Sequence, residues 1–333
     1  MIDCPLPIGQ YDRIVLGHGS GGRLSAELVA RVFAPPPPLE DQATLALDAS
    51  RIAMTTDAFV VRPLFFPGGD IGRLAIDGTV NDLAVGGAIP RWISAAFILE
   101  EGLPIVDLHR IVQSMRRACD EAEVRLVTGD TKVVERGKGD GVFITTTGIG
   151  VVPAGLELSI ANARVGDRIV VSGPLGDHGV ALLSVRDGTA LETDLVSDVA
   201  PVTGLVRALL AAVPNVRCMR DPTRGGLASA TTELAQASRV GVRLDERALP
   251  LRDAVRAACE LWGLDPLHMA SEGRVMAVVP AADADRALAA LGNDAAIVGE
   301  CVDAHAGMVT LASRAGGERI VAMLAGEPLP RIC

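Results

Sequence analysis

The chain has 333 residues, of which 49% are apolar and 22% charged, a composition typical of folded globular proteins and not of disordered ones. This length predicts two domains, and the formal net charge of −10 argues against nucleic acid as the main partner. No apolar stretch reaches the roughly 18 residues of a membrane helix. The first ten residues lack the basic end and apolar segment of a secretory signal. We therefore expect a cytoplasmic protein without a membrane partner.

The N-terminal half of the sequence predicts an arm followed by an α/β unit. Residues 1–42 form the arm, with four glycines among residues 17–23, a short helical pattern at 24–32 and four prolines at 35–38. Residues 43–153 form the α/β unit. Hydrophobic periodicity predicts strands at 51–56, 91–99, 125–128 and 142–152, and helices at 74–85 and 104–119. The strand at 125–128 runs into Gly129-Asp130-Thr131-Lys132, which we interpret as a turn.

A second α/β unit is expected from residue 154 to 325. Strands are predicted at 168–172, 275–279 and 297–302, and helices at 205–213, 227–238 and 283–291, with another beginning at Val180. Asp177-His178-Gly179 is interpreted as the entry to that helix. The last eight residues, 326–333, contain Pro328 and Pro330 and predict an extended, exposed tail.

Six cysteines occur, at positions 4, 119, 218, 259, 301 and 333, with no Cys-x-x-Cys pair among them. The first five are interpreted as small core residues of a protein in a reduced compartment. Cys333 differs because it ends the chain. An eight-residue extended tail reaches about 26 Å, so it could carry a thiol between a partner's active site and its own, or the cysteine could have no role.

Acidic residues of the N-terminal half fall at strand ends or in predicted turns, at Asp41, Asp57, Asp82 and Asp130. Carboxylates that converge at strand ends can hold Mg²⁺ against a polyphosphate, since magnesium prefers oxygen ligands. Each one alone could be a turn aspartate or a helix cap. Four such positions favour a metal site over four separate caps.

Three further segments have chemical potential. The glycines at 17–23 could surround phosphate with backbone N–H groups or form a plain flexible loop; there is no Walker motif. Asp221-Pro222-Thr223-Arg224-Gly225-Gly226 opens a predicted helix, whose N-terminus favours anions, although a cap and turn would also explain it. Glu272 precedes an apolar strand and could be a general base or a turn acid.

Together these segments resemble the HypE family of hydrogenase maturation proteins, the carbamoyl dehydratases. The resemblance covers essentially the whole chain. It lies in the glycine loop at 17–23 and in segments 55–61, 63–72, 81–83, 97–104, 127–134 and 220–227, and in the terminal Pro330-Arg331-Ile332-Cys333.

The resemblance implies a two-domain fold like that of aminoimidazole ribonucleotide synthetase, forming a homodimer that binds ATP and Mg²⁺. It implies that a HypF-type carbamoyltransferase loads Cys333, that the thiocarbamate is dehydrated to a thiocyanate, and that a HypC–HypD complex receives the cyanide for a NiFe hydrogenase. The expected catalytic residues are Cys333, Lys132 and Glu272, and the expected metal ligands are Asp41, Asp57, Asp82, Asp130 and Asp221. The expected nucleotide contacts are His18, Gly19, Ser20, Gly21, Gly22, Asn81, Thr131, Arg224, Gly225 and Gly226.

Two alternatives remain open at this level. A small-molecule kinase or synthetase of the same fold, such as thiamine-phosphate kinase or selenophosphate synthetase, would not need a terminal thiol. A non-catalytic ATP-binding scaffold would not release phosphate after carbamoylation.

Overall fold

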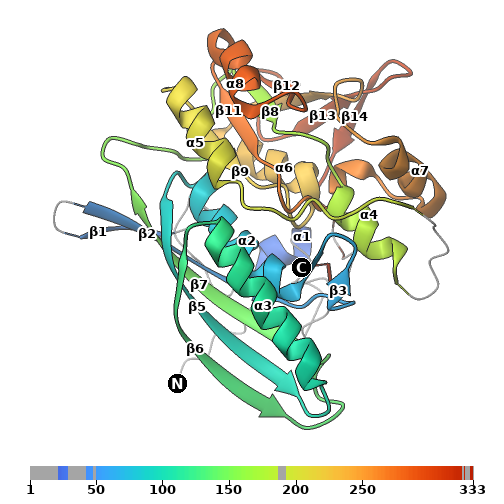
Figure 1. The fold of residues 1–333 in the computed structure, drawn as a ribbon. Helices are drawn as coiled ribbons and strands as arrows, with labels where there is room; N and C mark the ends of the chain where they lie inside the picture. Colours follow the sequence, from blue (N-terminus) through green and yellow to red (C-terminus); the bar gives the residue numbers. More distant parts are fainter. Residues whose placement is uncertain are drawn as a thin grey trace, which may run out of the picture.

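Two sheets with their own helices follow one another along the chain in the computed structural model (Figure 1). The structure describes residues 22–28, 43–47, 50–186, 193–324, 326 and 331–332. The expected two-domain α/β architecture is confirmed. Asp41, the glycine loop as far as Gly21, and Cys333 lie outside the described residues.

The N-terminal sheet has five strands in the order β1-β2-β7-β5-β6, all antiparallel except the β5–β6 pair. The two helices α2 and α3 cover one face of it (Figure 1). A short ribbon of two strands, β3 and β4, leads into α2. The bounds are β1 Ala43–Leu47, β2 Ser50–Phe59, β3 Phe65–Phe66, β4 Gly69–Asp70, α2 Ile71–Val85, β5 Ile89–Glu100, α3 Ile105–Glu121, β6 Arg125–Val134 and β7 Val142–Val152, after a short α1 at Arg23–Leu28.

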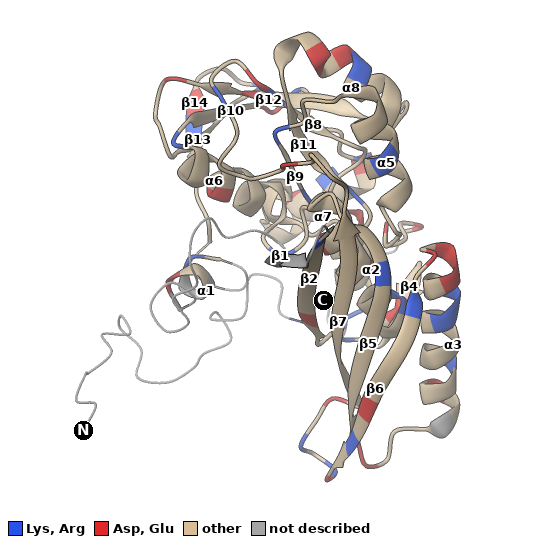
Figure 2. Cartoon of the chain, turned by 90° about the vertical axis from the view of Figure 1, so that its left-hand side faces the viewer, with Lys and Arg blue, Asp and Glu red and all other residues tan. Residues whose placement is uncertain are grey.

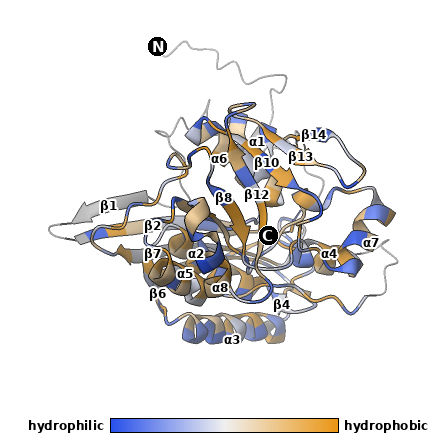
Figure 3. Ribbon diagram, turned by 90° about the horizontal axis from the view of Figure 1, so that it is seen from above, coloured by the Kyte–Doolittle hydropathy of each residue, from blue (hydrophilic) through white to orange (hydrophobic). Residues whose placement is uncertain are grey.

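Local chemistry explains where these helices begin. The Asp70 side chain caps α2 by accepting hydrogen bonds from the backbone N–H groups of Gly72 and Arg73, at 2.8 and 3.0 Å. Helix α3 starts after Pro104, and its apolar residues face the sheet while many hydrophilic residues face outward (Figure 3). Ile111 and Met115 of α3 are fully buried in the resulting core.

The face of the N-terminal sheet away from α2 and α3 exposes apolar side chains. On this face, cross-strand pairing places apolar residues in two rows. One row contains Met54, Ile149 and Trp92, and the other contains Phe143 and Ile98. Met54, Trp92 and Ile98 are 41%, 42% and 43% exposed. Figure 2 shows few charged residues along β2, β7 and β5. We refer to this surface as the open face.

The C-terminal sheet has seven strands in the order β14-β13-β10-β12-β8-β11-β9, all antiparallel except the β10–β13 pair. Helices α5 and α8 pack on one face, and α6 packs on the other. The bounds are β8 Arg168–Val171, α4 Asp177–Ser184, α5 Thr203–Ala212, β9 Cys218–Arg220, α6 Gly226–Ser238, β10 Gly241–Asp245, α7 Asp253–Trp262, β11 Met276–Val279, α8 Ala284–Leu291, β12 Ala296–Val302, β13 Val309–Ala312 and β14 Glu318–Val321.

The two halves share one hydrophobic core. Val180 of α4 and Val255 and Cys259 of α7 join the cluster built by the N-terminal sheet and its helices. Ile332, from the tail, belongs to the same cluster and is only 5% exposed. The expectation of an exposed tail is therefore wrong for Ile332, because its apolar side chain packs into this cluster.

Several predicted element bounds need correction. Strand β2 does not end at Asp57 but continues to Phe59, and α4 begins at Asp177 rather than Val180. Gly129 to Lys132 are not a turn, since they lie within β6. Gly129 is required there because a Cβ would lie 2.3 Å from the carbonyl oxygen of Ala95 on the paired strand. Among the described residues, no helix combines the length and apolarity that crossing a bilayer would need.

Candidate active site

An acidic cavity of about 240 Å³ lies where the two halves meet. Strand β2, helix α2, the loop after β9 and the first turns of α6 all contribute to its wall. The lining residues are Asp57, Asp82, Arg220, Asp221, Thr223, Arg224, Gly226, Ser229, Ala230 and Glu233. The structure therefore brings together predicted site residues that are more than 160 positions apart in the sequence.

Threonine hydroxyls hold the two aspartates of the N-terminal half in place. Thr79 donates to Asp57 at 2.9 Å, and Thr55 donates to Asp82 at 2.7 Å. Burial raises the pKa of Asp57, while the hydrogen bond from Thr79 and the positive charge of Arg224 act in the opposite direction. Both carboxylates are thus fixed before any ligand arrives.

Asp221 faces them from the C-terminal half. Burial raises its pKa to about 6, the nearby Asp57 adds to this rise, and Arg220 and Arg224 oppose it. Arg220 also pairs with Glu233 of α6 at 2.5 Å. The cavity therefore holds several carboxylates whose repulsion is only partly balanced by arginine.

The first turn of α6 approaches this cavity through Gly225 and Gly226, both with left-handed φ angles of 75° and 59°. A Cβ on Gly226 would lie 2.5 Å from the carbonyl oxygen of Leu267. Glycine is therefore needed here for close packing and for its backbone conformation. The N–H of Gly226 donates to the carbonyl of Thr223 at 2.9 Å. The N–H groups that follow it in the first helical turn have no intrahelical acceptor, which makes this end of α6 suitable for phosphate.

Glu272 lies buried beside the cavity, with 2% of its surface exposed. Its backbone is held at both ends: its N–H donates to Asp198 at 3.0 Å, and its carbonyl accepts from Asn81 at 2.9 Å. Among the described residues, its Oε1 has no hydrogen-bond partner. Burial, and then the charges of Asp221 and Asp198, raise the pKa of Glu272 well above its ordinary value.

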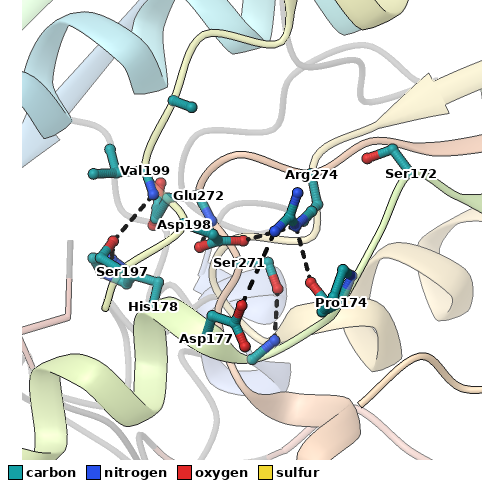
Figure 4. Close-up of polar contacts among 12 residues, drawn as sticks. Ser172, Pro174, Asp177, His178, Ser197, Asp198, Val199, Ser271, Glu272 and Arg274 are labelled. Carbon is teal, nitrogen blue, oxygen red and sulfur yellow. Dashed lines mark hydrogen bonds and ion pairs between the residues drawn. The ribbon is translucent and has the colours of Figure 1, made fainter. Parts of the chain in front are cut away.

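A network of buried ionic contacts supports Glu272 (Figure 4). Arg274 lies 3.3 Å from Asp198 and donates to the carbonyl of Pro174 at 2.9 Å. Asp177, at the start of α4, accepts from Arg252 at 2.8 Å. Arg274 also lies 4.0 Å from Asp177, so the loop that carries Glu272 is tied to segment 197–199 and to α4.

Sequence reasoning missed two parts of this arrangement. Asp177-His178-Gly179 does form the first turn of α4, as expected. The role of His178 as a contact of the tail was not predicted, nor was the support that Asp198 and Arg274 give to Glu272. Buried polar partners that are distant in sequence leave no local sequence pattern. For His178, the only local indication of a special role was the glycines beside it.

The assignment of Asn81 to nucleotide binding is not supported by its surroundings. Asn81 is fully buried, donates to the carbonyls of Ala200 and Glu272, and accepts from the N–H of Val202 at 2.8 Å. These bonds use its amide group within the protein. Asn81 joins α2 to the C-terminal half, while its neighbour Asp82 faces the cavity.

The segment Gly129 to Lys132 does not reach the cavity within one chain. Asp57, Thr146, Ala95 and Gly129 form one row across the sheet, three strand spacings or about 14 Å wide. Asp130 is one residue further along β6 and so points to the opposite face. Its side chain is 66% exposed and lies 3.5 Å from the ammonium group of Lys132, which is 74% exposed.

Four cysteines behave as the sequence predicted. Cys119, Cys218, Cys259 and Cys301 are buried cysteines outside any disulfide among the described residues. Burial raises the pKa of Cys119 and Cys259 to about 11 and that of Cys301 to about 12. Because the thiolate is the reactive form, these three are inert at neutral pH.

The donor set fits Mg²⁺ held loosely in the cavity. Within the described part of the chain, no three His, Cys, Asp or Glu side chains form a ready-made metal site. Magnesium usually keeps several waters and takes one or two carboxylates together with substrate phosphates. Asp57, Asp82 and Asp221 line the same cavity, and this set of carboxylates matches that mode of binding.

Family models and known proteins that match this chain all point to the same family. The AIR synthase related N-terminal domain matches residues 39–152, and the C-terminal domain of the same family matches residues 164–312. Carbamoyl dehydratase HypE of Azotobacter vinelandii is 55% identical over 327 residues, covering 95% of this chain and 96% of that protein. The protein of the same name from Escherichia coli K12 is 45% identical, covering 97% and 100%.

Solved structures agree with this. A HypE–HypF complex has a chain with a TM-score of 0.85 and 45% identity, covering 91% of this chain and all of that one. HypE in complex with ATP has a TM-score of 0.82 and 45% identity, covering 96% and 100%. A ThiL bound to AMPPCP and TMP, at 20% identity and a TM-score of 0.70, shares the fold. The chain therefore belongs to the HypE family of hydrogenase maturation proteins, the ATP-dependent carbamoyl dehydratases built on the AIR synthase fold.

Proposed function

We propose that the chain dehydrates an S-carboxamide on its own Cys333 to a thiocyanate, which supplies cyanide ligands for the iron of a NiFe hydrogenase. One observation carries the proposal. Ile332, which directly precedes Cys333 in the sequence, is docked into the core that both halves share, and segment 197–199 supports both this tail residue and Glu272. A kinase of the same fold has no need to anchor its own C-terminus there.

The acidic cavity is the proposed nucleotide site. ATP would donate a phosphoryl group to the carboxamide oxygen, a poor leaving group, so that this oxygen leaves as part of phosphate. Asp57, Asp82 and Asp221 would hold Mg²⁺, which neutralises phosphate charge, with Asp41 and Asp130 as further ligands. The phosphates are held by Arg224, Gly225 and Gly226 at the start of α6, together with Thr131 and the segment His18, Gly19, Ser20, Gly21 and Gly22.

Glu272 is the proposed base. Forming C≡N from the carboxamide removes two protons from nitrogen and expels oxygen, so a carboxylate must accept protons near the reacting carbon. A carboxylate with a raised pKa is a stronger base once ionised. Within the described part of the chain, one oxygen of Glu272 has no partner, which leaves it available for this contact.

Lys132 and Asp130 enter the proposal through a homodimer. Lys132 stands at the end of the apolar row of Phe143 and Ile98 on the open face. A second copy covering this face would bury Met54, Trp92 and Ile98, and would bring β6 of one copy towards the cavity of the other. Lys132 would then lie near the transferred phosphoryl group.

We further propose the domain boundaries and partners expected from the sequence. These are an arm at 1–42, an ATP-binding and dimerising domain at 43–153, a second domain at 154–325 and a mobile tail at 326–333. A HypF-type transferase would load Cys333, and a HypC–HypD complex would receive the cyanide, all in the cytoplasm. A structure of a HypE–HypF complex among the relatives supports the first of these partners.

Intact-mass measurement tests the reaction. The protein is incubated with ATP, carbamoyl phosphate and the partner transferase, and its mass is followed over time. The expected result is the gain of one carbamoyl group, then the loss of water from the adduct with release of phosphate. The Cys333→Ala variant should show neither. Transfer of phosphate to an added small molecule, with no change in protein mass, would favour the kinase alternative. A carbamoyl adduct that never loses water would favour the scaffold.

A further inference from the structure

The described end of the tail is held by both halves of the molecule. The backbone turns at Arg331, whose φ is 55°, and this turn directs Ile332 into the core. The carbonyl of Arg331 accepts from the N–H of Arg62 at 3.2 Å and from the guanidinium of Arg186, and its side chain pairs with Asp140. The carbonyl of Ile332 lies 2.8 Å from Nε2 of His178.

The hydrogen bonds around the neutral ring of His178 have one possible direction. A carbonyl can only accept, so Nε2 of His178 carries the proton and donates to Ile332. The other ring nitrogen, Nδ1, then accepts from the hydroxyl of Ser197 at 2.8 Å. The Ser197 oxygen in turn accepts from the N–H of Val199 at 3.1 Å. The chain of bonds thus runs from Val199 through Ser197 and His178 to the tail.

The surroundings of His178 keep its ring neutral and fixed. His178 is fully buried, and Phe66 meets it edge to face with ring centroids 5.4 Å apart. Burial lowers the pKa of His178 to about 4, and the positive charge of Arg186 contributes in the same direction. Arg186 is the charged group whose field acts on the pKa of His178. Only the neutral tautomer can accept from Ser197 while donating to Ile332.

The same segment also positions Glu272. Ser197 binds the histidine, and the next residue, Asp198, accepts from the N–H of Glu272 and pairs with Arg274 (Figure 4). The N–H of Ser197 donates to the carbonyl of Pro67 in the N-terminal half at 2.8 Å. Segment 197–199 therefore connects the tail contact and the proposed base through adjacent residues.

We propose that His178 is a positioning residue that binds the carbonyl of Ile332, the penultimate residue, and so docks the tail beside the segment that holds Glu272. This role adds detail to the proposed function. Only the dehydration that follows docking rests on that function. The docking itself is independent of any chemistry. The contact is made to a backbone carbonyl, so we expect the tail to dock whether Cys333 is free or carbamoylated.

Trypsin measures docking without any activity. The bond after Arg331 is cut only when the tail leaves its site, because Ile332 is buried and both neighbouring carbonyls are bonded. Cleavage after Arg314, in the exposed turn between β13 and β14, serves as a reference within the same molecule. Intact mass reports loss of the terminal dipeptide.

The full-length variants His178→Leu, His178→Gln and Ser197→Ala are compared with His109→Leu, a change at an exposed histidine on α3. Removing the donor should raise cleavage after Arg331, relative to that after Arg314, by about fivefold, the effect of one net hydrogen bond. His178→Gln retains a donor and should stay closer to the wild type. Equal cleavage in all variants would overturn the proposal. If His178→Leu fails to fold, the cleavage ratio of Ser197→Ala tests the proposal instead.

A single-turnover assay separates this proposal from the proposed function. The carbamoylated protein is mixed with ATP, and loss of water from the adduct is followed. His178→Leu should slow this step, because fewer tails are docked at any moment, and should not slow carbamoyl loading. A wild type that never converts the adduct would refute the function and leave the docking result standing. A variant with a freed tail and an unchanged conversion rate would refute the positioning role.

Discussion

Replacing Asn81 by alanine should destabilise the protein without weakening nucleotide binding by the folded molecule. Asn81 makes three hydrogen bonds, two to carbonyls of Ala200 and Glu272 and one from the N–H of Val202. At about 1 kcal/mol net for each, their loss costs about 3 kcal/mol, and more if the groups left behind find no water. For a domain of this size the melting temperature should fall by roughly 6–12 °C.

Differential scanning fluorimetry with and without ATP measures both effects. The matched control is Asn162→Ala, because Asn162 is exposed and makes one long bond of 3.4 Å to the carbonyl of Glu157. That control should melt within about 1–2 °C of the wild type. If Asn81→Ala melts like the wild type but loses the ATP-induced stabilisation, Asn81 is a nucleotide ligand and the structural reasoning is wrong.

Four further outcomes are expected. Gly226→Ala should lower stability by more than about 1 kcal/mol in thermal melts, whereas Gly204→Ala, where a Cβ meets nothing within 4 Å, should be neutral or slightly stabilising. Asp82→Asn should abolish ATP-dependent phosphate release with the fold intact by circular dichroism; wild-type release would exclude Asp82 as a ligand. Lys132→Ala should slow dehydration more than carbamoyl loading, with Lys138→Ala as the control; equal effects on both steps would contradict the assignment. Binding of Mg²⁺ and nucleotide by calorimetry should weaken as pH falls through about 6, because Asp221 must be ionised to bind metal, and Asp221→Asn should flatten that dependence.

The sequence alone was sufficient for the elements with strong periodicity. The strand predicted at 142–152 has those bounds in the structure, and α2 and α3 differ from expectation by only a few residues. The short strands β10, β13 and β14 and the helix α7 were not predicted. Four or five residues carry too little periodicity to distinguish a strand from a loop.

The sequence indicated which residues belong to the candidate site, but not which way their side chains face. Asp57, Asp82, Asp221, Arg224 and Gly226 meet in one cavity, as their motifs suggested. Neighbours on a helix point about 100° apart, so whether Asn81 or Asp82 faces the cavity depends on how α2 packs. The faces of Asp130 and Lys132 depend on the register of β6, which an irregularity beside Ile93 shifts. Tertiary packing decides both.

The docked tail also links the two halves of the molecule. Arg331 is bonded to Arg62 in one half and to Arg186 in the other, so residues more than 250 positions apart are held together at the C-terminus. Such a contact closes a long loop and restricts the chain as a reversible cross-link would. A partner that draws the tail out must open this loop, and amide hydrogen exchange in α4 and around Pro67 should then accelerate. The molecule would thus be looser while its terminus is being loaded than while its terminus is reacting.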